Sequence, residues 1–245
     1  MTLTEILPSA QGIEGLDREP IRVVVVEDEP LYRDLLRLAL ERVGFEVVGA
    51  FADAESALRE AAALVPDVAL LDIELGSAIS GVEVGIRLRR GVPALGVVLL
   101  SNHLSPELVG ALPTDVVGGW SYLSKRTVTD VDALRRAITG AADGLVVFDP
   151  ILTRAGSIRA NSPLGRLSPR QREIVELIAQ GYSNKAIAEH LVLTEKSVEN
   201  HITRIYQQVG IDAHDLATHQ RVQVALLYTD GMDAAAYAYG HRLLR

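Results

Sequence analysis

The chain has 245 residues, of which 48% are hydrophobic and 23% are charged, and it contains no cysteine. This composition is that of a folded globular chain, and it excludes a largely disordered chain, a disulfide-rich scaffold and thiolate metal sites. Residues 1–150 carry 23 acidic and 13 basic side chains, whereas residues 151–245 carry nine acidic and 11 basic ones. Any nucleic-acid contact is therefore expected from the second part, because lysine and arginine neutralise phosphate groups.

The sequence shows neither a membrane segment nor a secretory signal. Apolar runs such as 23–26 and 97–100 are far shorter than the ~18 residues that a membrane-spanning helix needs. Residues 1–20 carry several acidic side chains rather than a basic start followed by an apolar run. We therefore expect a cytoplasmic protein that makes no membrane contact.

Short β-branched runs alternate with amphipathic stretches from residue 21 to residue 143, which is the pattern of βαβ units. Strands that are almost wholly apolar indicate a parallel sheet covered on both faces. The expected fold class is a doubly wound α/β domain with a five-stranded parallel sheet. The expected strands are 21–26, 46–50, 68–71, 96–100 and 120–123, and the expected helices are 31–43, 54–64, 82–90, 106–112 and 130–142.

The remainder of the chain carries only helical signals after a stretch rich in glycine, proline, serine and asparagine. Three short helices with N-caps at Ser168, Ser183 and Thr194 predict a small all-α helix-turn-helix domain. Apolar residues from 216 to 228 suit a fourth helix, which could pair with its copy in a dimer or pack within its own chain. The expected segments are an N-terminal extension (1–20), the α/β domain (21–143), a linker (144–165), the helix-turn-helix domain (166–230) and a C-terminal tail (231–245).

Charged and polar side chains stand where the predicted strands end. Glu27 and Asp28 follow the first strand, Asp72 the third, Ser101 the fourth and Lys125 the fifth. An acidic residue after a strand, taken singly, is more often a helix cap. All five side chains are nevertheless expected to converge, because ligands bind outside the carboxyl ends of parallel strands. Three carboxylates would repel one another, and Mg²⁺ relieves this because it prefers oxygen ligands. Asp72, alone at its strand end, is then the candidate nucleophile for phosphorus, with Lys125 and the Ser101 hydroxyl holding phosphoryl oxygens.

These residues lie in motifs that resemble the receiver domain of bacterial two-component response regulators. The resemblance covers residues 21–142 and rests on VEDEP at 26–30, LDIEL at 71–75, LS at 100–101 and YLSK at 122–125. It implies a flavodoxin-like fold and phosphorylation by a sensor histidine kinase. It also implies that Asp72 is the phosphoacceptor, that Glu27, Asp28, Asp72 and the Glu74 main-chain carbonyl bind Mg²⁺, that Ser101 is the switch hydroxyl and that Tyr122 is the switch aromatic.

The loop after Asp72 departs from the family pattern. The family usually has a proline four residues after the phosphorylated aspartate and a glycine four residues later, whereas this chain has Gly76 and then Gly81, one residue further on. We therefore expect a longer and looser loop beside Asp72. This keeps open a phosphorylation-independent regulator whose receiver serves only as a dimerisation module.

An enzyme is the remaining alternative. Mg²⁺-dependent phosphatases that use an aspartyl phosphate place a second acid two residues after the nucleophile, and Glu74 would have to serve here. No substrate cap domain is evident in the sequence, so this alternative ranks last. We do not expect an enzyme.

The third helix of the second domain has two distinct faces. Val198, Ile202, Ile205 and Val209 recur at helical spacing and predict a buried stripe. At about 100° per residue, the opposite face carries side chains that read base edges or bind phosphate. Residues near helix N-termini are further candidates for backbone contacts. The expected DNA-binding residues are Lys185, Thr194, Lys196, Asn200, Thr203, Arg204 and Gln207.

The surrounding sequence resembles the LuxR-type helix-turn-helix of the NarL/FixJ response regulators. The resemblance rests on LSPRQREI at 167–174, GYSNKAIA at 181–188 and SVENHI at 197–202. It implies a regulator that controls transcription by sequence-specific DNA binding. One recognition helix buries little DNA surface, so we expect a homodimer as the active form, reading two half-sites about one helical turn apart.

Overall fold

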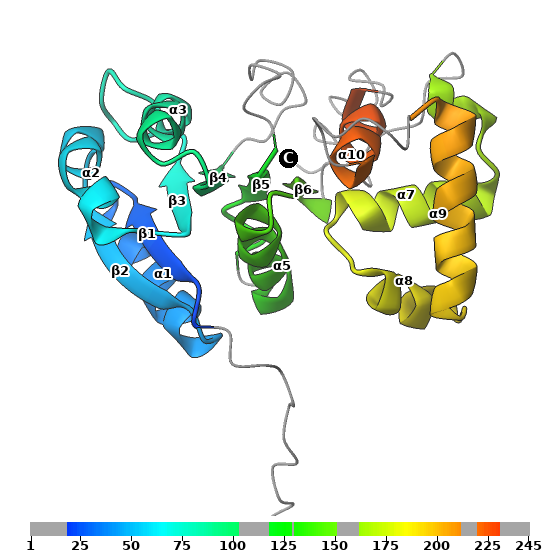
Figure 1. Ribbon diagram of the computed structural model, residues 1–245. Coiled ribbons are helices and arrows are strands. Elements are labelled where there is room, and N and C mark those ends of the chain that lie inside the picture. Colours follow the sequence, from blue (N-terminus) through cyan, green and yellow to red (C-terminus); the bar gives the residue numbers. More distant parts are fainter. Residues whose placement is uncertain (1–18, 103–117, 129, 151–161, 212–219, 231–245) are drawn as a thin grey trace, which may run out of the picture.

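The computed structural model describes residues 19–102, 118–128, 130–150, 162–211 and 220–230. Within these ranges an α/β domain and a helical domain lie side by side (Figure 1). The elements of the α/β domain are β1 (Arg22–Val26), α1 (Pro30–Arg42), β2 (Glu46–Phe51), α2 (Ala54–Glu60), the 3₁₀ helix η1 (Ala61–Leu64), β3 (Val68–Asp72), α3 (Gly81–Gly91), β4 (Gly96–Ser101), β5 (Trp120–Ser124), α5 (Val131–Ala142) and β6 (Val147–Phe148).

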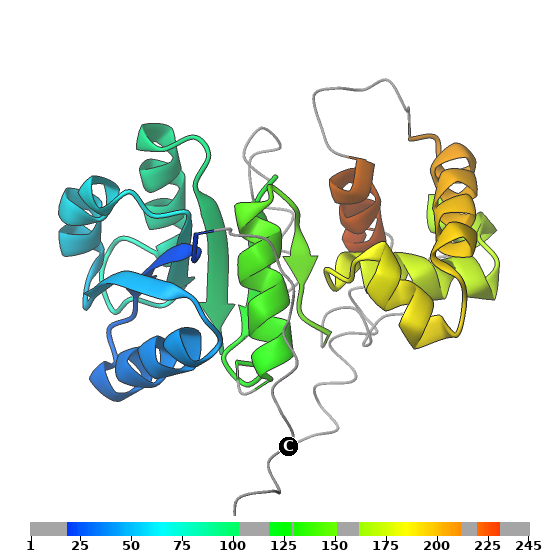
Figure 2. The ribbon, with the colours of Figure 1, turned by 60° about the horizontal axis from the view of Figure 1, so that its bottom comes forward.

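The α/β domain is built on one parallel sheet with the strand order β2-β1-β3-β4-β5-β6. Alternate residues of a strand point to opposite faces, so Val24 and Val26 pack with α2 and α3, whereas Val23 and Val25 pack with α1 and α5. Figures 1 and 2 show these helix pairs on opposite faces of the sheet. Coverage of both faces explains why the central strands are apolar throughout.

The sequence-based prediction of a doubly wound parallel fold is confirmed, and each of the five predicted strands ends within one residue of the observed strand. The number of strands is corrected from five to six. β6 lies inside the segment expected as a linker, and its two residues are too few to show a periodicity. It pairs with β5 through Ser121 and Tyr122, and Phe148 is fully buried there. The helix expected at 106–112 lies outside the described residues.

The helical domain contains the three helices of the predicted helix-turn-helix, each with the expected cap. Ser168 forms a reciprocal capping box with Gln171, and Ser183 and Thr194 each accept a hydrogen bond from a backbone amide of the following helix. The elements are the 3₁₀ helix η2 (Pro163–Arg166), α7 (Pro169–Ala179), α8 (Asn184–Leu191), α9 (Glu195–Val209) and α10 (Gln220–Asp230).

The fourth helix packs within its own chain. Val222 and Ala225 of α10 are buried in the same apolar cluster as residues of α7, which is one of the two arrangements left open by the sequence. Among the helices of the described ranges, none combines the length and the apolar character needed to cross a bilayer.

The two domains touch through the turn between α7 and α8. On α5, Arg136 donates from Nε to the Gln180 carbonyl oxygen at 3.1 Å, and its guanidinium lies 4.3 Å from the centre of the Tyr182 ring. The Gly181 backbone lies so close to Val147 of β6 that an added Cβ would stand 2.8 Å from the valine Cγ2. α9 lies on the outer side of the helical domain, away from the sheet (Figures 1 and 2).

Candidate functional site

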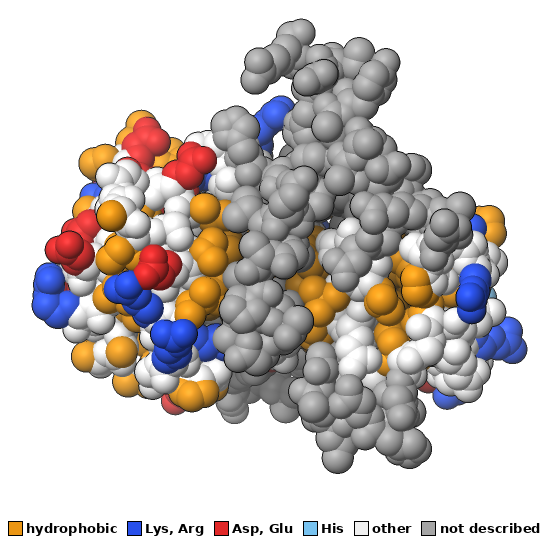
Figure 3. Space-filling model, turned by 90° about the horizontal axis from the view of Figure 1, so that it is seen from above, with side chains coloured by type: hydrophobic (Ala, Val, Ile, Leu, Met, Phe, Trp, Pro, Cys, Tyr) orange, Lys and Arg blue, Asp and Glu red, His pale blue; other side chains and the backbone are white. Residues whose placement is uncertain are grey.

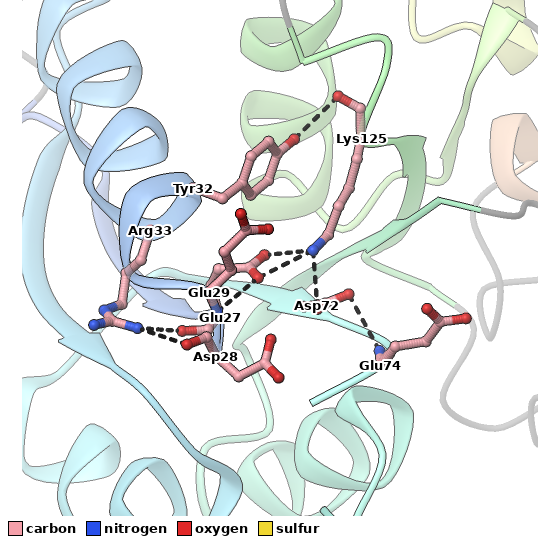
Figure 4. A network of polar contacts seen from close by, with 8 residues as sticks. All are labelled: Glu27, Asp28, Glu29, Tyr32, Arg33, Asp72, Glu74 and Lys125. Atoms are coloured by element: carbon pink, nitrogen blue, oxygen red, sulfur yellow. Dashed lines mark hydrogen bonds and ion pairs between the residues drawn. The ribbon is translucent and has the colours of Figure 1, made fainter. Parts of the chain in front are cut away.

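Three carboxylates gather at one edge of the sheet. Glu27 and Asp28 directly follow β1, and Asp72 is the last residue of β3, the strand that pairs with β1 in parallel. An oxygen atom from each carboxylate lies within 4.8 Å of the other two. Glu27 and Asp72 are buried, with 0% and 2% of their surface exposed, whereas Asp28 is open to solvent. Of the five side chains expected to converge, these three carboxylates lie together (Figure 4).

Lys125 places its ammonium group between the two buried carboxylates. Its Nζ atom lies 2.8 Å from Glu27 Oε2 and 3.0 Å from Asp72 Oδ2. Burial raises the pKa of Glu27 and of Asp72 above the usual carboxyl values, and the hydrogen bond from Lys125 opposes the rise in each case. The cluster thus holds three acids and one ammonium, and this imbalance of charge favours the binding of a further cation.

Tyr32 and Arg33 of α1 stabilise this cluster through hydrogen bonds to main-chain oxygens. The Tyr32 hydroxyl donates to the Lys125 carbonyl oxygen at 3.0 Å, and its ring centre lies 4.8 Å from Lys125 Nζ. Burial raises the pKa of Tyr32 to about 12, so the hydroxyl keeps its proton at neutral pH. Arg33 donates to the Glu27 carbonyl oxygen at 2.6 Å and so fixes the chain where β1 ends.

The loop after β3 supports Asp72 through its backbone. The Glu74 amide donates to Asp72 Oδ1 at 3.1 Å, whereas the Glu74 side chain points away from Asp72 (Figure 4). Gly81 begins α3 directly over Asp72, and a Cβ added there would stand 1.9 Å from the Asp72 carbonyl oxygen. Position 81 therefore accepts only glycine in this backbone. Metal binding by the Glu74 carbonyl stays a prediction.

The two residues predicted to act as a switch lie on β4 and β5. Ser101 ends β4 with 2% of its surface exposed, and its main-chain oxygen accepts a hydrogen bond from the Lys125 amide at 2.9 Å. Tyr122 is 1% exposed and stacks on Phe148 of β6 with 5.7 Å between ring centres. Burial raises the pKa of the Tyr122 hydroxyl, which is therefore neutral in this protein.

The faces predicted for α9 are confirmed. Val198, Ile202 and Ile205 are buried, and Lys196 forms an ion pair with Glu199 at 2.9 Å along the exposed side. The Thr194 hydroxyl already serves as the helix N-cap, where it accepts from the Ser197 amide at 3.2 Å. Every residue of the predicted DNA-binding set is exposed, namely Lys185, Thr194, Lys196, Asn200, Thr203, Arg204 and Gln207.

Sequence reasoning missed the side chains that hold these elements in place. Tyr32 meets Lys125 across 93 positions of the chain, a contact for which a single sequence carries no signal. In the helical domain, Arg170 donates to the Leu191 carbonyl oxygen at the end of α8, and Arg221 of α10 donates to the Asn184 side-chain oxygen at 2.8 Å. Arginines on helix surfaces look alike in a sequence, whichever partner they bind.

Comparison with known proteins agrees with this architecture. A family model of the response regulator receiver domain matches residues 23–139, and a model of bacterial regulatory proteins of the luxR family matches residues 165–227. The probable transcriptional regulatory protein NarL of Mycobacterium tuberculosis is 33% identical over 214 residues, which cover 85% of this chain and 97% of that protein. The chain belongs to the NarL/FixJ family of response regulators.

Two further relatives match 80% and 91% of this chain. The nitrate/nitrite response regulator protein NarL of Escherichia coli is 31% identical and covers 80% of this chain and 92% of its own length. The transcriptional regulatory protein LiaR of Bacillus subtilis is 29% identical and covers 91% of this chain and 99% of its own length. Both therefore match this response regulator across its two domains, which we now call the receiver domain and the DNA-binding domain.

The electrostatics of the site predict that Asp72→Asn stabilises the metal-free protein at neutral pH. The variant removes one desolvated charge and keeps an oxygen acceptor for Lys125, so its free energy of unfolding is expected to exceed that of the wild type. A carboxyl whose pKa is raised in the folded state contributes stability at low pH that is lost as the pH rises through that pKa. The gain should therefore vanish below the ordinary carboxyl pKa. Urea unfolding in the presence of a chelator, at neutral pH and at a pH below the ordinary carboxyl pKa, measures this difference in the free energy of unfolding.

Asp53→Asn is the matched control for that measurement. Its carboxylate caps α2 by accepting from the Ser56 amide at 2.8 Å, and this hydrogen bond lowers the pKa of Asp53. Its contribution to stability is present above the ordinary carboxyl pKa, which is the opposite sign. A loss of stability at neutral pH in Asp72→Asn would contradict the electrostatic account of the site.

Proposed function

We propose that Asp72 of this response regulator accepts a phosphoryl group from a sensor histidine kinase, and that the DNA-binding domain then controls transcription at specific sequences. The observation that supports phosphoryl transfer is the convergence of Glu27, Asp28 and Asp72, with the Lys125 ammonium between Glu27 and Asp72. The exposed polar face of α9 supports DNA recognition. In this role the protein is a regulator rather than an enzyme.

The acidic cluster fits Mg²⁺ by the chemistry of its donors. Glu27, Asp28 and Asp72 offer only oxygen atoms, which are the ligands that this ion prefers, and the Glu74 main-chain carbonyl would complete the protein's share. Burial raises the pKa of Glu27 and of Asp72 even with Lys125 beside them, so a bound cation would favour their ionised forms. When bound there, Mg²⁺ supplies neutralising charge for the phosphoryl oxygens.

Each side chain of the site has a separate role in phosphoryl transfer. An Asp72 carboxylate oxygen attacks phosphorus, the bond from phosphorus to the histidine nitrogen of the kinase breaks, and an acyl phosphate forms on Asp72. Lys125 Nζ, which lies 3.0 Å from Asp72 Oδ2, is placed to bind a phosphoryl oxygen, and Ser101 supplies a hydroxyl donor from the next strand. Tyr122 follows the movement of Ser101 as the switch aromatic.

Phosphorylation on Asp72 has a direct test. Full-length protein incubated with Mg²⁺ and a small phosphodonor is expected to gain one acid-stable, base-labile phosphoryl group, seen by intact-protein mass spectrometry. Asp72→Asn should gain none, because an amide is not a nucleophile for phosphorus. The matched control is Asp149→Asn, which changes another buried aspartate and should label as the wild type does. Equal labelling of Asp72→Asn would refute the assignment, and an unlabelled wild type would favour a phosphorylation-independent regulator.

Sequence recognition is assigned to one face of α9. Asn200 and Gln207 present amide groups that can read base edges, and Arg204 makes no ion pair within the described part of the chain. Lys185 and Thr194, near the N-termini of α8 and α9, are placed for phosphate contacts. In Figure 3 lysine and arginine side chains lie at the outer end of the DNA-binding domain, whereas the receiver domain shows most of the acidic side chains in view together with further basic ones.

Substitutions on this face are expected to have two different effects on DNA binding. Asn200→Ala should cost about 1–3 kcal/mol at the specific site and little elsewhere, because it removes a contact to a base. Arg204→Ala and Lys196→Ala should weaken binding to all sequences and flatten the salt dependence by about one unit each. A salt-titrated binding assay separates these outcomes, with Arg90→Ala on the receiver domain as the control cation. Wild-type affinity in all three α9 variants would show that the face only meets solvent.

The structure bears on the two alternative functions. The Glu74 carboxylate points away from Asp72 and is poorly placed as the general acid of a phosphatase (Figure 4). The phosphorylation-independent regulator keeps one supporting observation, since the polar α9 face is exposed to solvent. With α9 already exposed, we propose that phosphorylation acts on the assembly of two copies.

Assembly under phosphorylation control predicts that the dimer fraction and the DNA affinity rise together. Sedimentation and DNA titration of the phosphorylated and unphosphorylated full-length protein measure both quantities. Two recognition helices on adjacent half-sites bury more DNA surface than one, so dimer formation itself raises affinity. Equal dimer fraction and equal affinity in the two forms would refute the switch and identify the receiver domain as a constitutive dimerisation module.

A further inference from the structure

Gly76 lies against the exposed carboxylate of the acidic cluster. Its φ is +59°, in the left-handed region that favours glycine, and a Cβ added to it would stand 2.9 Å from Asp28 Oδ2. Apart from the two chain neighbours of Gly76, no other residue of the described ranges has an atom within 4 Å of that Cβ position. The space beside Asp28 is therefore bounded by a glycine backbone that carries no side chain.

Asp28 differs from the other two carboxylates in how it is held. Lys125 binds both Glu27 and Asp72, whereas no ion pair or hydrogen bond to the Asp28 carboxylate is made by the residues that the structure describes. No hydrogen bond or ion pair from the described residues thus fixes this side chain, and the space around it limits where it can stand. Its place within 4.8 Å of the other acidic oxygens depends on the room left by Gly76.

We propose that Gly76 is a positioning residue for the cation site, because it leaves the space in which the Asp28 carboxylate stands beside Glu27 and Asp72. The inference rests on the proposed Mg²⁺ site and adds a residue to it. Any side chain at position 76 would displace the Asp28 carboxylate from the cluster and weaken cation binding.

The loop around Gly76 is held more firmly than Asp28. Leu75 is 4% exposed, and Ser77 bridges the loop by donating to the Ile79 carbonyl oxygen at 2.9 Å and accepting from the Ile79 amide. Asp28 is an exposed side chain with free torsions, so it yields first when a Cβ is added. The effect of a substitution then falls on cation binding more than on the fold.

The test is calorimetric titration of Mg²⁺ into the full-length protein, with Gly76→Ala compared to the wild type. We expect the Kd for Mg²⁺ to rise about 10-fold, the lower end of what supporting residues of metal sites contribute. Gly44→Ala is the matched control, because Gly44 also has a positive φ, +92°, but beyond its chain neighbours no atom of the described residues lies within 4 Å of its Cβ position. It should lower the melting temperature comparably and leave the Kd unchanged.

Two further variants make the result decisive. Gly76→Asn keeps a Cβ but tolerates the left-handed backbone better, so it should show the same rise in Kd with a smaller loss of stability. In an Asp28→Ala background, where no carboxylate is left to displace, Gly76→Ala should add no further loss. An unchanged Kd in Gly76→Ala, or an equal rise in the Asp28→Ala background, would overturn the positioning role. A wild type that binds no Mg²⁺ would instead overturn the proposed metal site on which it rests.

Discussion

The ion pairs of Lys125 with Glu27 and Asp72 are the constraint on which the receiver domain depends. Burying two carboxylates is unfavourable unless a cation meets them, and the cation comes from a residue 98 positions after Glu27. Only the strand order brings the two together, because β1, β3, β4 and β5 are adjacent and parallel and so end at the same edge. The order of the strands in the sheet therefore determines which side chains meet in the site. The buried apolar strands hold those side chains in fixed positions.

A chain of contacts leads from this edge to the DNA-binding domain. Tyr122 stacks on Phe148 of β6, the adjacent Val147 lies against Gly181, and Gly181 belongs to the turn that leads into α8. Such a route carries coupling when an element along it has two arrangements that both sites bias. In the proposed switch Tyr122 would be that element, and its stacking on Phe148 of β6 connects its ring to the domain contact.

The sequence predicts a structural feature well when residues close together in the chain determine that feature. Hydrophobic periodicity and capping residues are local, so the five longer strands, the caps at Ser168 and Ser183 and the two faces of α9 were predicted correctly. β6 was missed because two residues show no period and tertiary contact with β5 defines the strand. The brace of Tyr32 on Lys125 and the steric role of Gly76 are long-range contacts, which a single sequence does not encode as a pattern.

The two glycines after Asp72 explain how a loop that departs from the family pattern leaves the acidic cluster intact. Gly81 is fixed by the fold, since its backbone lies on the Asp72 carbonyl oxygen and neither group can move aside. The extra residue must then be taken up between positions 76 and 80, and the positive φ of Gly76 turns the chain there. A proline at 76 could not adopt this φ, because its ring holds φ near −65°. Glycine in place of the usual proline is thus the local condition that lets the longer loop close beside Asp28 without displacing it.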